Sequence, residues 1–559
     1  MAAGALIAVF ILQSFLASLR KSGTSDEPAH IAAGLSYLET GIFNINIQHP
    51  PLLKELSAAS LMLAGVRYPR TAEAMEVVQA PPNNSGREWQ VGYQIIASGP
   101  DRVMFWARLP MIGIAALLGV VLYLLGRRVV GEAAALGAVF LYAFDPAALA
   151  HSYLVTTDIG LTAFGLLFLL ALCRYIEQPT RARMIWCGAA MGLMLGAKYS
   201  GVFLVPVAAV LLAAAAVRRE PVVAAASAAG RSRKGRSEVK RAARGGMRID
   251  WATLGRFAPD FLWMCGIAWL LAWSFFFFHG GPLMYVDGME RVNADHNPNF
   301  VAFLAGELQP RFTWFFAACY LLKEPLAEIL LAAAGLWLAA RSRAISGVGK
   351  LFLLLPPAAL FAAYMWGAAN LGIRYLLPVL PFAWLLGGVT LAALVGSARR
   401  GPRVAGFALC AWVVIAAAGI YPDHLSYFNE SACLLDDPGK IGWDGGSKCG
   451  TAWLADSNVD WGQGLKELKR WLDAHAGSRP VYLACFACVP PETYGIQAAM
   501  PDFSAPPLRG LYVVSGHFVA SLPALGRKMH RPVGYWLPRV KPEAVVGHAY
   551  YVYDFASGK

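Results

Sequence analysis

The sequence "GALIAVFILQSFLASL" (residues 4–19) is followed almost at once by "TSDEPAHIAAGLSYLETGIFNINIQHPPLLKEL" (residues 24–56). The first segment is apolar and long enough to approach a membrane span. The second places an Asp-Glu pair, two histidines and a Pro-Pro pair just beyond it. Ionisable groups are costly inside a membrane, and those gathered at an apolar helix mark candidate functional sites. The two segments together predict a membrane protein whose site lies just outside its first helix.

The rest of the chain has the same apolar character. Hydrophobic residues make up 57% of its 559 residues and charged residues 15%, whereas soluble proteins carry about 25% charged residues. About eleven apolar runs approach or reach the length that crosses a core of ~30 Å. They lie near 3–19, 104–125, 131–149, 158–175, 184–197, 201–217, 258–278, 325–340, 350–368, 375–396 and 404–421. We therefore predict a polytopic α-helical membrane protein.

Basic residues orient the predicted bundle. Lys and Arg follow the second, fourth, eighth and tenth runs and are densest in 218–256. Short basic loops stay in the cytoplasm, so this segment is predicted as a flexible cytoplasmic linker that can touch anionic lipid; RNA binding is the alternative. The stretch 20–103 becomes the first exported loop, with interfacial helices. Arg20 and Lys21 stand against this trend.

The chain past residue 421 has the composition of a soluble domain. "TAWLAD", "PVYLACF", "LYVVSG" and "AYYVYDF" are predicted as strands, and "GLKELKRWLDA" as an amphipathic helix. The prediction is a transmembrane domain over 1–421 and a small exported α/β domain over 422–559. An oxidising compartment would allow Cys433 to pair with Cys449, while Cys485 and Cys488 suit a tight disulfide or half of a metal site.

Two acidic positions lie on the predicted exported face. Asp26 and Glu27 open a short helix, with Pro28 in its first turn, and Asp158 ends "HSYLVTTD" before the fourth run. Each acid could simply cap a helix. Two such positions on one face of an apolar bundle indicate a site instead.

Three cations face the same side against the positive-inside trend. Lys198 lies in "GAKYSG", Lys323 in "LLKEPL" and Arg374 in "NLGIRYLLP". They could pair with acids, reach to lipid head groups or clamp a phosphate. Sugar transfer from a lipid phosphate needs such a combination. A carboxylate takes the proton of the acceptor hydroxyl, and cations stabilise the departing phosphate.

The opening stretch resembles the first exported loop of the protein O-mannosyltransferases and their bacterial relatives, which are membrane glycosyltransferases of the C-type fold. The matching residues are the pair Asp26–Glu27 and the motif from His49 through Pro50, Pro51 and Leu52 to Lys54. "HSYLVTTD", which begins at His151, "GAKYSG", "LLKEPL" and "GIRYLLPVLPF" are similar to later landmarks of the bacterial members. "ADSNVDWGQGLKELKRWL" resembles the C-terminal domain of one bacterial subgroup.

This resemblance implies a polyprenyl-phosphate sugar donor, inversion at the anomeric carbon, and Asp26 as the base. Glu27 and Asp158 are the further catalytic candidates, and the three cations are candidates for binding the donor phosphate. Loop-structuring or substrate-binding roles are predicted for His30, His49, Pro50, Pro51, Lys54 and His151. His30 follows the acid pair at a greater distance than the histidine of the eukaryotic members. The sequence assigns no metal ligand, although a divalent cation is compatible with it.

The expected partners are a polyprenyl-phosphate sugar, a protein, lipid or glycan acceptor, and membrane lipid, with no nucleic acid. The expected location is a bacterial inner membrane, with the site and the C-terminal domain outside the cytoplasm. A transporter of an envelope precursor is one alternative, although transporter sites usually lie near the bilayer midplane. A membrane-anchored glycan-binding protein is the other, since Trp443, Trp453 and Trp461 could stack on sugars.

Overall fold

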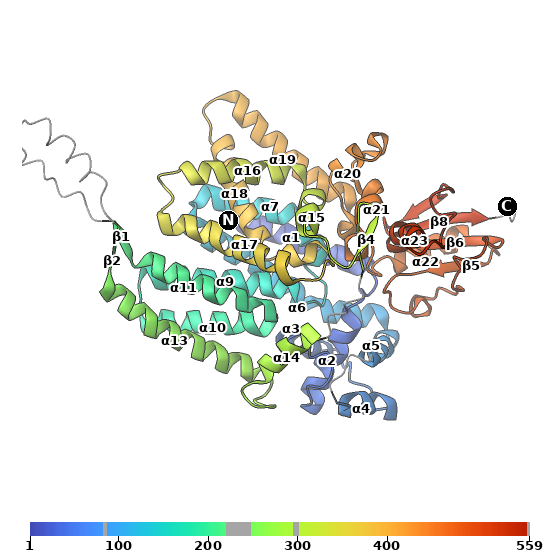
Figure 1. The fold of residues 1–559 in the computed structure, drawn as a ribbon, viewed down its shortest axis with the longest axis horizontal. Coiled ribbons are helices and arrows are strands. Elements are labelled where there is room, and N and C mark those ends of the chain that lie inside the picture. The colour runs from blue at the N-terminus through green and yellow to red at the C-terminus, as the bar shows by residue number, and fades with distance from the viewer. Residues whose placement is uncertain (82–85, 220–246, 295–300, 556–559) are drawn as a thin grey trace, which may run out of the picture.

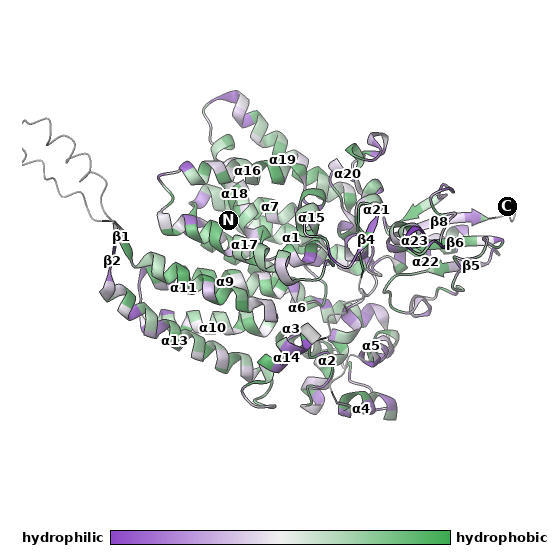
Figure 2. Ribbon diagram, viewed as in Figure 1, coloured by the Kyte–Doolittle hydropathy of each residue, from purple (hydrophilic) through white to green (hydrophobic). Residues whose placement is uncertain are grey.

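The computed structural model describes residues 1–81, 86–219, 247–294 and 301–555. Its largest part is a bundle of apolar helices lying roughly side by side (Figure 1), and Figure 2 shows hydrophobic residues concentrated on them. Each predicted apolar run contains a helix. These are α1 (Ala2–Arg20), α6 (Pro100–Val129), α7 (Glu132–Phe144), α9 (Asp158–Glu177), α10 (Arg181–Ala197), α11 (Leu204–Ala215), α13 (Trp251–Ser274), α16 (Leu326–Arg341), α17 (Gly347–Gly367), α18 (Leu380–Val395) and α19 (Arg400–Ile420).

The length and composition of these helices confirm the predicted class. Within the described ranges, six are long and apolar enough to cross a membrane, namely α1, α6, α9, α13, α17 and α19. The short run before Lys198 is one half of a turned pair. Helix α10 ends at Ala197, a 3₁₀ turn (η1) follows over Tyr199–Phe203, and α11 continues from Leu204.

Two short strands bracket the basic linker at one end of the bundle. Strand β1 (Val217–Arg219) pairs antiparallel with β2 (Met247–Ile249). Most of the predicted linker, residues 220–246, lies outside the described residues. The ribbon brings the ends of α11 and α13 together (Figure 1).

The opposite end of the bundle carries the helices of the first loop: α2 (Glu27–Thr40), α3 (Leu52–Leu63), α4 (Ala72–Gln79) and α5 (Arg87–Ala97). Pro51 directly precedes α3, where its fixed φ suits a helix start. Helices α2 and α3 approach closely at Gly34, where an added Cβ would lie 2.1 Å from the carbonyl oxygen of Lys54. Glycine at this position therefore fixes the packing of the loop that carries Asp26.

Short elements complete this end of the molecule. They are α8 (Pro146–His151), α14 (Met284–Ala294), the hairpin β3 (Ala302–Leu304) and β4 (Glu307–Gln309), α15 (Phe315–Lys323), η3 (Ile373–Leu376), η4 (His424–Ser426), α20 (Ser431–Leu434), η5 (Pro438–Lys440), η6 (Ser447–Cys449), α21 (Gly450–Trp453), η7 (Asp456–Asn458) and η8 (Pro491–Tyr494).

A small sheet forms the C-terminal part of the chain. Its strands are β5 (Val481–Ala484), β6 (Gly510–Ser515), β7 (Ala544–Val546) and β8 (Tyr550–Phe555), in the order β5-β6-β8-β7. Strands β5 and β6 are parallel and the other pairs antiparallel. Helix α22 (Leu465–His475) buries its leucines in one cluster with sheet residues, and α23 (Gly516–Met529) follows β6. The predicted α/β character of this region is confirmed.

One predicted strand is wrong. "TAWLAD" forms helix α21 and then a single bridge between Leu454 and Leu304. The Asp456 backbone is left-handed, with φ +58°, and the side chain of Asn458 accepts a hydrogen bond from the Ile373 amide. Side-chain bonds to backbone groups of this kind compete with a regular strand, so the segment turns instead of extending.

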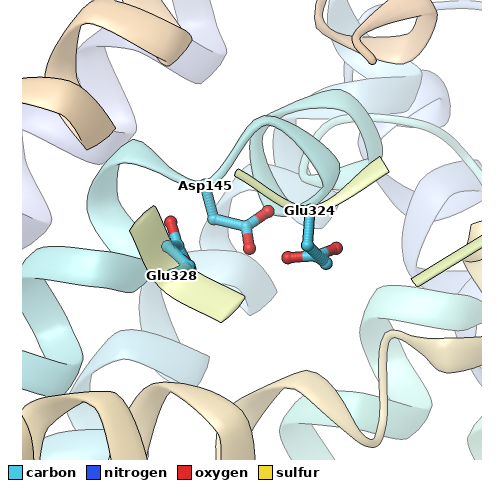
Figure 3. Close-up of side chains that lie close together, drawn as sticks. All are labelled: Asp145, Glu324 and Glu328. Carbon is cyan, nitrogen blue, oxygen red and sulfur yellow. The ribbon is translucent and has the colours of Figure 1, made fainter. Parts of the chain in front are cut away.

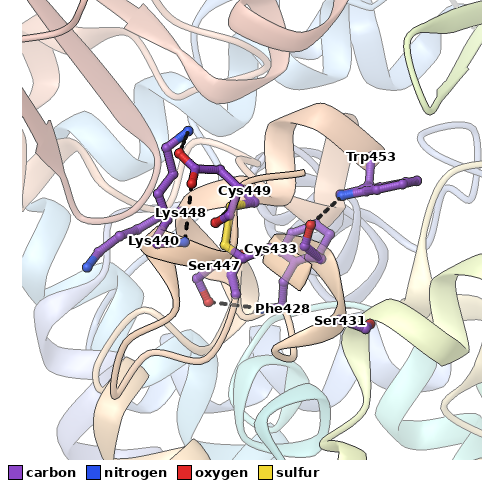
Figure 4. Close-up of a disulfide and its surroundings, with 12 residues drawn as sticks. Phe428, Ser431, Cys433, Lys440, Ser447, Lys448, Cys449 and Trp453 are labelled. Carbon is purple, nitrogen blue, oxygen red and sulfur yellow. Dashed lines mark hydrogen bonds and ion pairs between the residues drawn. A yellow bond between two sulfur atoms is a disulfide. The ribbon is translucent and has the colours of Figure 1, made fainter. Parts of the chain in front are cut away.

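The four cysteines past residue 421 form two disulfides. Cys433 pairs with Cys449, as predicted, and Figure 4 shows this bond beside Trp453, whose indole donates to the Ala432 carbonyl at 2.8 Å. Cys485 pairs with Cys488. The second pair is therefore a disulfide, not half of a metal site.

Lys21 joins the first loop to the C-terminal part. Its buried ammonium contacts the Asp423 carboxylate and lies 2.7 Å from Glu467. His548, between β7 and β8, places Nδ1 at 2.7 Å from Asp423 and Nε2 at 3.3 Å from Asp444. Only the protonated imidazolium can donate to both carboxylates. The charge of Lys21 is therefore neutralised by two acids.

We expect the attachment of the C-terminal sheet to weaken at high pH. Burial opposes the charge on His548, but its bonds to Asp423 and Asp444 outweigh burial and raise the His548 pKa from 6.5 to about 9. The stability that protonated His548 contributes through these two bonds is complete below pH 6.5, and it is lost as the pH rises through about 9. The protection of the amides of residues 544–555 against exchange, measured relative to their intrinsic exchange rate at each pH, should fall over this interval. His548→Asn should remove this fall in protection, and an unchanged protection profile in that variant would contradict the assignment.

Candidate active site

Asp26 does not cap its helix. It is the residue before α2, yet its side chain makes no capping hydrogen bond. Its carboxylate instead lies 2.7 Å from Nη1 of Arg374, which comes from η3 before α18. Both side chains are partly exposed, at 23% for Asp26 and 12% for Arg374. The capping alternative is therefore wrong for Asp26, and the pair is accessible to a ligand.

Asp158 and Lys198 form a second ion pair. Their atoms are 2.5 Å apart, and both side chains are largely buried. Asp158 is the first residue of α9, where Thr157 is the cap. The Lys198 ammonium lies 4.6 Å from the ring centre of Tyr375, and the Arg374 guanidinium 5.7 Å from the same ring. The two ion pairs therefore meet at Tyr375.

Glu27 is the anchor of the loop. Its carboxylate is fully buried and binds Arg108 of α6 through two contacts of 2.9 and 2.7 Å. It also accepts from the amides of Thr24 and Val155. Arg108 further donates to the carbonyl of Ser22. Sequence reasoning missed Arg108, because an arginine within an apolar run gives no sign of its partner.

The other loop candidates hold the chain in shape. The Lys54 ammonium is buried and donates to the carbonyl oxygens of Asn46 and His49 at 2.6 and 2.7 Å. Nδ1 of His30 lies 2.7 Å from the Val155 carbonyl oxygen. Burial lowers the pKa of His30 to about 4, so the ring is neutral at pH 7. The rings of His30 and His49 meet edge to face at 5.2 Å.

Pro50 and Pro51 are buried at the turn into α3. They therefore shape the loop, and their side chains offer no polar group to a substrate.

Lys323 belongs to neither of the two ion pairs. Its ammonium is buried and donates to the carbonyl oxygens of Leu425 and Asn458 at 2.8 and 2.6 Å, and it lies 4.2 Å from the ring centre of Phe428. These contacts favour a role in attaching the C-terminal segment over phosphate binding. His151 is buried, with its ring 6.4 Å from that of Trp461.

The segment 455–464 supplies residues that sequence reasoning did not place in the site. Trp461 lies under Arg374, with 4.3 Å from the guanidinium to the ring centre. Ser457 donates to the Leu371 carbonyl at 2.9 Å, so this segment positions Arg374. The backbone amide of Ser25 donates to the Trp461 carbonyl oxygen at 3.1 Å. The sequence did contain the motif "ADSNVDWGQG" (residues 455–464), but only the folded structure shows that it contacts Arg374 and the loop that carries Asp26.

Asp456 adds a third carboxylate. Burial raises the pKa of Asp456 to about 6; the charge of Arg374 acts in the opposite direction, and that of Asp26 adds to the rise. These mutual effects place Asp456 within electrostatic reach of the Asp26–Arg374 pair. At pH 7 most of its population is ionised.

A separate cluster could hold a cation. Asp145, Glu324 and Glu328 are buried, and one oxygen of each lies within 4.8 Å of the others (Figure 3). Asp145 accepts hydrogen bonds from the Trp384 indole and the Ala148 amide. Buried carboxylates this close share protons or bind a cation.

Comparison with known proteins supports the family relationship. Residues 94–228 match the family model described as dolichyl-phosphate-mannose-protein mannosyltransferase. The predicted relationship to the protein O-mannosyltransferases is confirmed over this part of the chain. No curated protein matches the sequence.

Three solved structures show similarity. ArnT from Cupriavidus metallidurans is 14% identical over 99% of this chain and 98% of its own, with a TM-score of 0.45. The oligosaccharyltransferase AglB from Archaeoglobus fulgidus is 15% identical over 75% and 54%, with a TM-score of 0.42. The Pmt1-Pmt2 O-mannosyltransferase complex of S. cerevisiae is 15% identical over 55% and 39%, with a TM-score of 0.30. With TM-scores below 0.5, these similarities carry no functional weight.

Proposed function

We propose that this protein is a membrane glycosyltransferase that moves a sugar from a polyprenyl-phosphate-linked donor to a hydroxyl acceptor. The observation that carries the proposal is the Asp26–Arg374 pair, which lies at one end of an apolar bundle and leaves both side chains partly exposed. It offers a base and a phosphate-binding cation side by side. The family-model match to a mannosyltransferase over 94–228 supports this chemistry.

The reaction is a single displacement. Asp26 accepts the proton of the acceptor hydroxyl while that oxygen bonds to the anomeric carbon of the donor, and the configuration inverts. The bond from this carbon to the phosphate oxygen breaks, and the phosphate keeps the electron pair. Arg374 and Lys198 stabilise the charge that develops on the leaving phosphate.

The donor would also prepare the base. While Asp26 is bonded to Arg374, the guanidinium occupies the carboxylate that must take the proton. A phosphate that binds Arg374 competes for the same hydrogen-bond donors and releases this carboxylate to the acceptor hydroxyl. Asp158 and Lys198 form a second acid–cation pair beside the same Tyr375 ring.

The location follows from the same features. We place the site and the C-terminal sheet on the exported face of a bacterial inner membrane and the basic linker in the cytoplasm. The disulfides Cys433–Cys449 and Cys485–Cys488 support an oxidising compartment for that face. The sugar is a hexose, mannose-like, or a pentose, and the acceptor is a protein, lipid or glycan.

The direct test is transfer by the purified protein. Radiolabelled polyprenyl-phosphate mannose and a polyprenyl-phosphate pentose are offered with an envelope extract, and labelled products are identified by mass spectrometry. We expect transfer that depends on Asp26. A protein that moves lipid-linked precursors across vesicles without forming a glycosidic bond would be the alternative transporter, and one that retains glycans without turnover would be a binding protein.

Arg374→Ala and Lys198→Ala are expected to weaken the use of donor. Losing a charged hydrogen bond costs roughly 1.5–3 kcal/mol, which corresponds to about ten- to a hundredfold in kcat/KM for donor. Arg374→Lys should restore activity only in part, because lysine lacks the planar fork. Lys350→Ala, which removes an exposed contact to the Ala340 carbonyl at the linker end, is the matched control. Unchanged donor kinetics in both site variants would leave these residues as ion-pair partners alone.

A further inference from the structure

Arg20 is the cation that the proposed chemistry leaves unexplained. It ends α1 at the face that carries Asp26, against the positive-inside trend, and its side chain is exposed. Its guanidinium lies 5.5 Å from the ring centre of Tyr421. Unlike Lys21, which two acids neutralise, Arg20 contacts no carboxylate in the described part of the chain. Its charge is therefore free to meet a ligand.

Arg20 lines a cavity between the ends of α1 and α6 and helix α22. The cavity has a volume of about 640 Å³, within the range of about 300–1,000 Å³ that small-molecule sites occupy. Helix α22 contributes Lys466, Lys469 and Arg470 to the lining. Their spacing places them on one helix face, while its leucines are buried.

The charge of this lining is strongly positive. Four cations and one acid, Asp101, line the cavity, and Asp101 is paired with Lys466. Lys469 pairs with exposed Asp473, and Arg470 lies 4.0 Å from Glu467. Exposed pairs such as these contribute little. A phosphate, with several charged acceptor oxygens, can replace them.

The floor of the cavity is apolar and continues along the bundle. Leu19, Met104 and Phe105 line it. Leu12, Leu16 and Leu19 are 57%, 42% and 43% exposed, and their spacing forms one stripe on α1. A basic recess thus lies at the end of an exposed apolar stripe on a helix that is long and apolar enough to cross a membrane. This combination fits an amphiphile with a phosphate head group.

We propose that this cavity binds the head group of an anionic phospholipid of the surrounding bilayer, with the acyl chains along α1. Arg20, Lys469 and Arg470 contact the phosphate. The site is separate from the Asp26–Arg374 pair, so its occupancy can be tested without any transfer reaction. By seating a lipid between α1 and α22, it would strengthen the attachment of the C-terminal part to the membrane.

The test uses the full chain in phosphatidylcholine nanodiscs that contain a small fraction of phosphatidylglycerol with a photoreactive acyl chain. After irradiation, labelled peptides are mapped. We expect labelling of residues 2–20 and 100–129, and unlabelled phosphatidylglycerol should compete. One cation near the membrane surface is worth about fivefold in binding. Arg20→Gln should therefore raise the amount of unlabelled phosphatidylglycerol that halves the labelling about fivefold. Arg20→Gln/Lys469→Gln/Arg470→Gln should raise it about a hundredfold.

The control variant Arg399→Gln/Arg400→Gln/Arg403→Gln removes three exposed charges at the start of α19 and should leave this labelling unchanged. Equal labelling in the wild type and the triple cavity variant would overturn the proposal. Equal labelling by a photoreactive phosphatidylcholine would also overturn it. Displacement of the probe by millimolar inorganic phosphate would reassign the cavity to free phosphate. If the triple variant unfolds, Arg20→Gln decides the question alone, because the Arg20 side chain is exposed.

Discussion

Asp26→Asn is expected to lower turnover by ~10²-fold or more, the scale of a lost general base, with little change in thermal stability. Asparagine keeps the size of the side chain and can still accept a hydrogen bond from Arg374, but it cannot take a proton. The Asp26 carboxylate makes no capping bond, so the substitution does not weaken the start of α2. The measurement is kcat with a defined donor, beside thermal unfolding in detergent.

The informative comparison is with Asp158→Asn, because Asp158 has the same kind of cationic partner. A protein that keeps near-normal turnover with Asp26→Asn and loses it with Asp158→Asn would have Asp158 as its base. Asp436→Asn is the matched control, since Asp436 is exposed and lies outside the site.

Glu27→Gln is expected to act on stability. Glu27 and Arg108 are fully buried together, and removing one partner of a buried pair costs roughly 3–5 kcal/mol because the other charge is left unpaired. We therefore expect a large fall in unfolding temperature, and a loss of activity that follows the loss of folded protein. Glu76→Gln breaks an exposed pair with Arg87 in the same loop and should leave the unfolding temperature unchanged.

A second variant separates structure from chemistry at this position. Glu27→Gln/Arg108→Met removes both charges, and it should recover part of the stability that the single change loses. Turnover per folded molecule should recover with it. If Glu27→Gln instead unfolds like the wild type and has no turnover, then Glu27 takes part in the reaction.

The apolar runs were enough to predict the membrane bundle. A helix must satisfy its backbone hydrogen bonds within itself to exist in lipid, so a long apolar run has one available structure. The bounds of α2 were also predictable. Pro28 lies in its first turn, and Gly41 directly follows its last residue, Thr40. The amphipathic face of α22 and the pairing of Cys433 with Cys449 were also predictable, because each depends on residues close together in the chain.

The partners of the charged residues were decided only by the tertiary structure. Asp26 and Arg374 are 348 residues apart, and no periodicity relates them. The sequence left capping and a site as alternatives for Asp26, and the hydrogen bond that its carboxylate accepts from Arg374 of η3 distinguishes between them. Lys198 and Lys323 appear equivalent in the sequence, yet one meets Asp158 and the other meets carbonyl oxygens.

The same distinction explains the segment "TAWLAD". Its composition suits a strand, but a strand needs a neighbour along its length. In the folded chain the next residues bind the loop that carries Arg374. Local sequence therefore determined most of the helices and strands of this protein and where they begin and end. The three-dimensional packing of distant segments determined which groups each charge meets, because a buried charge is stable only beside groups that pair with it or accept its hydrogen bonds.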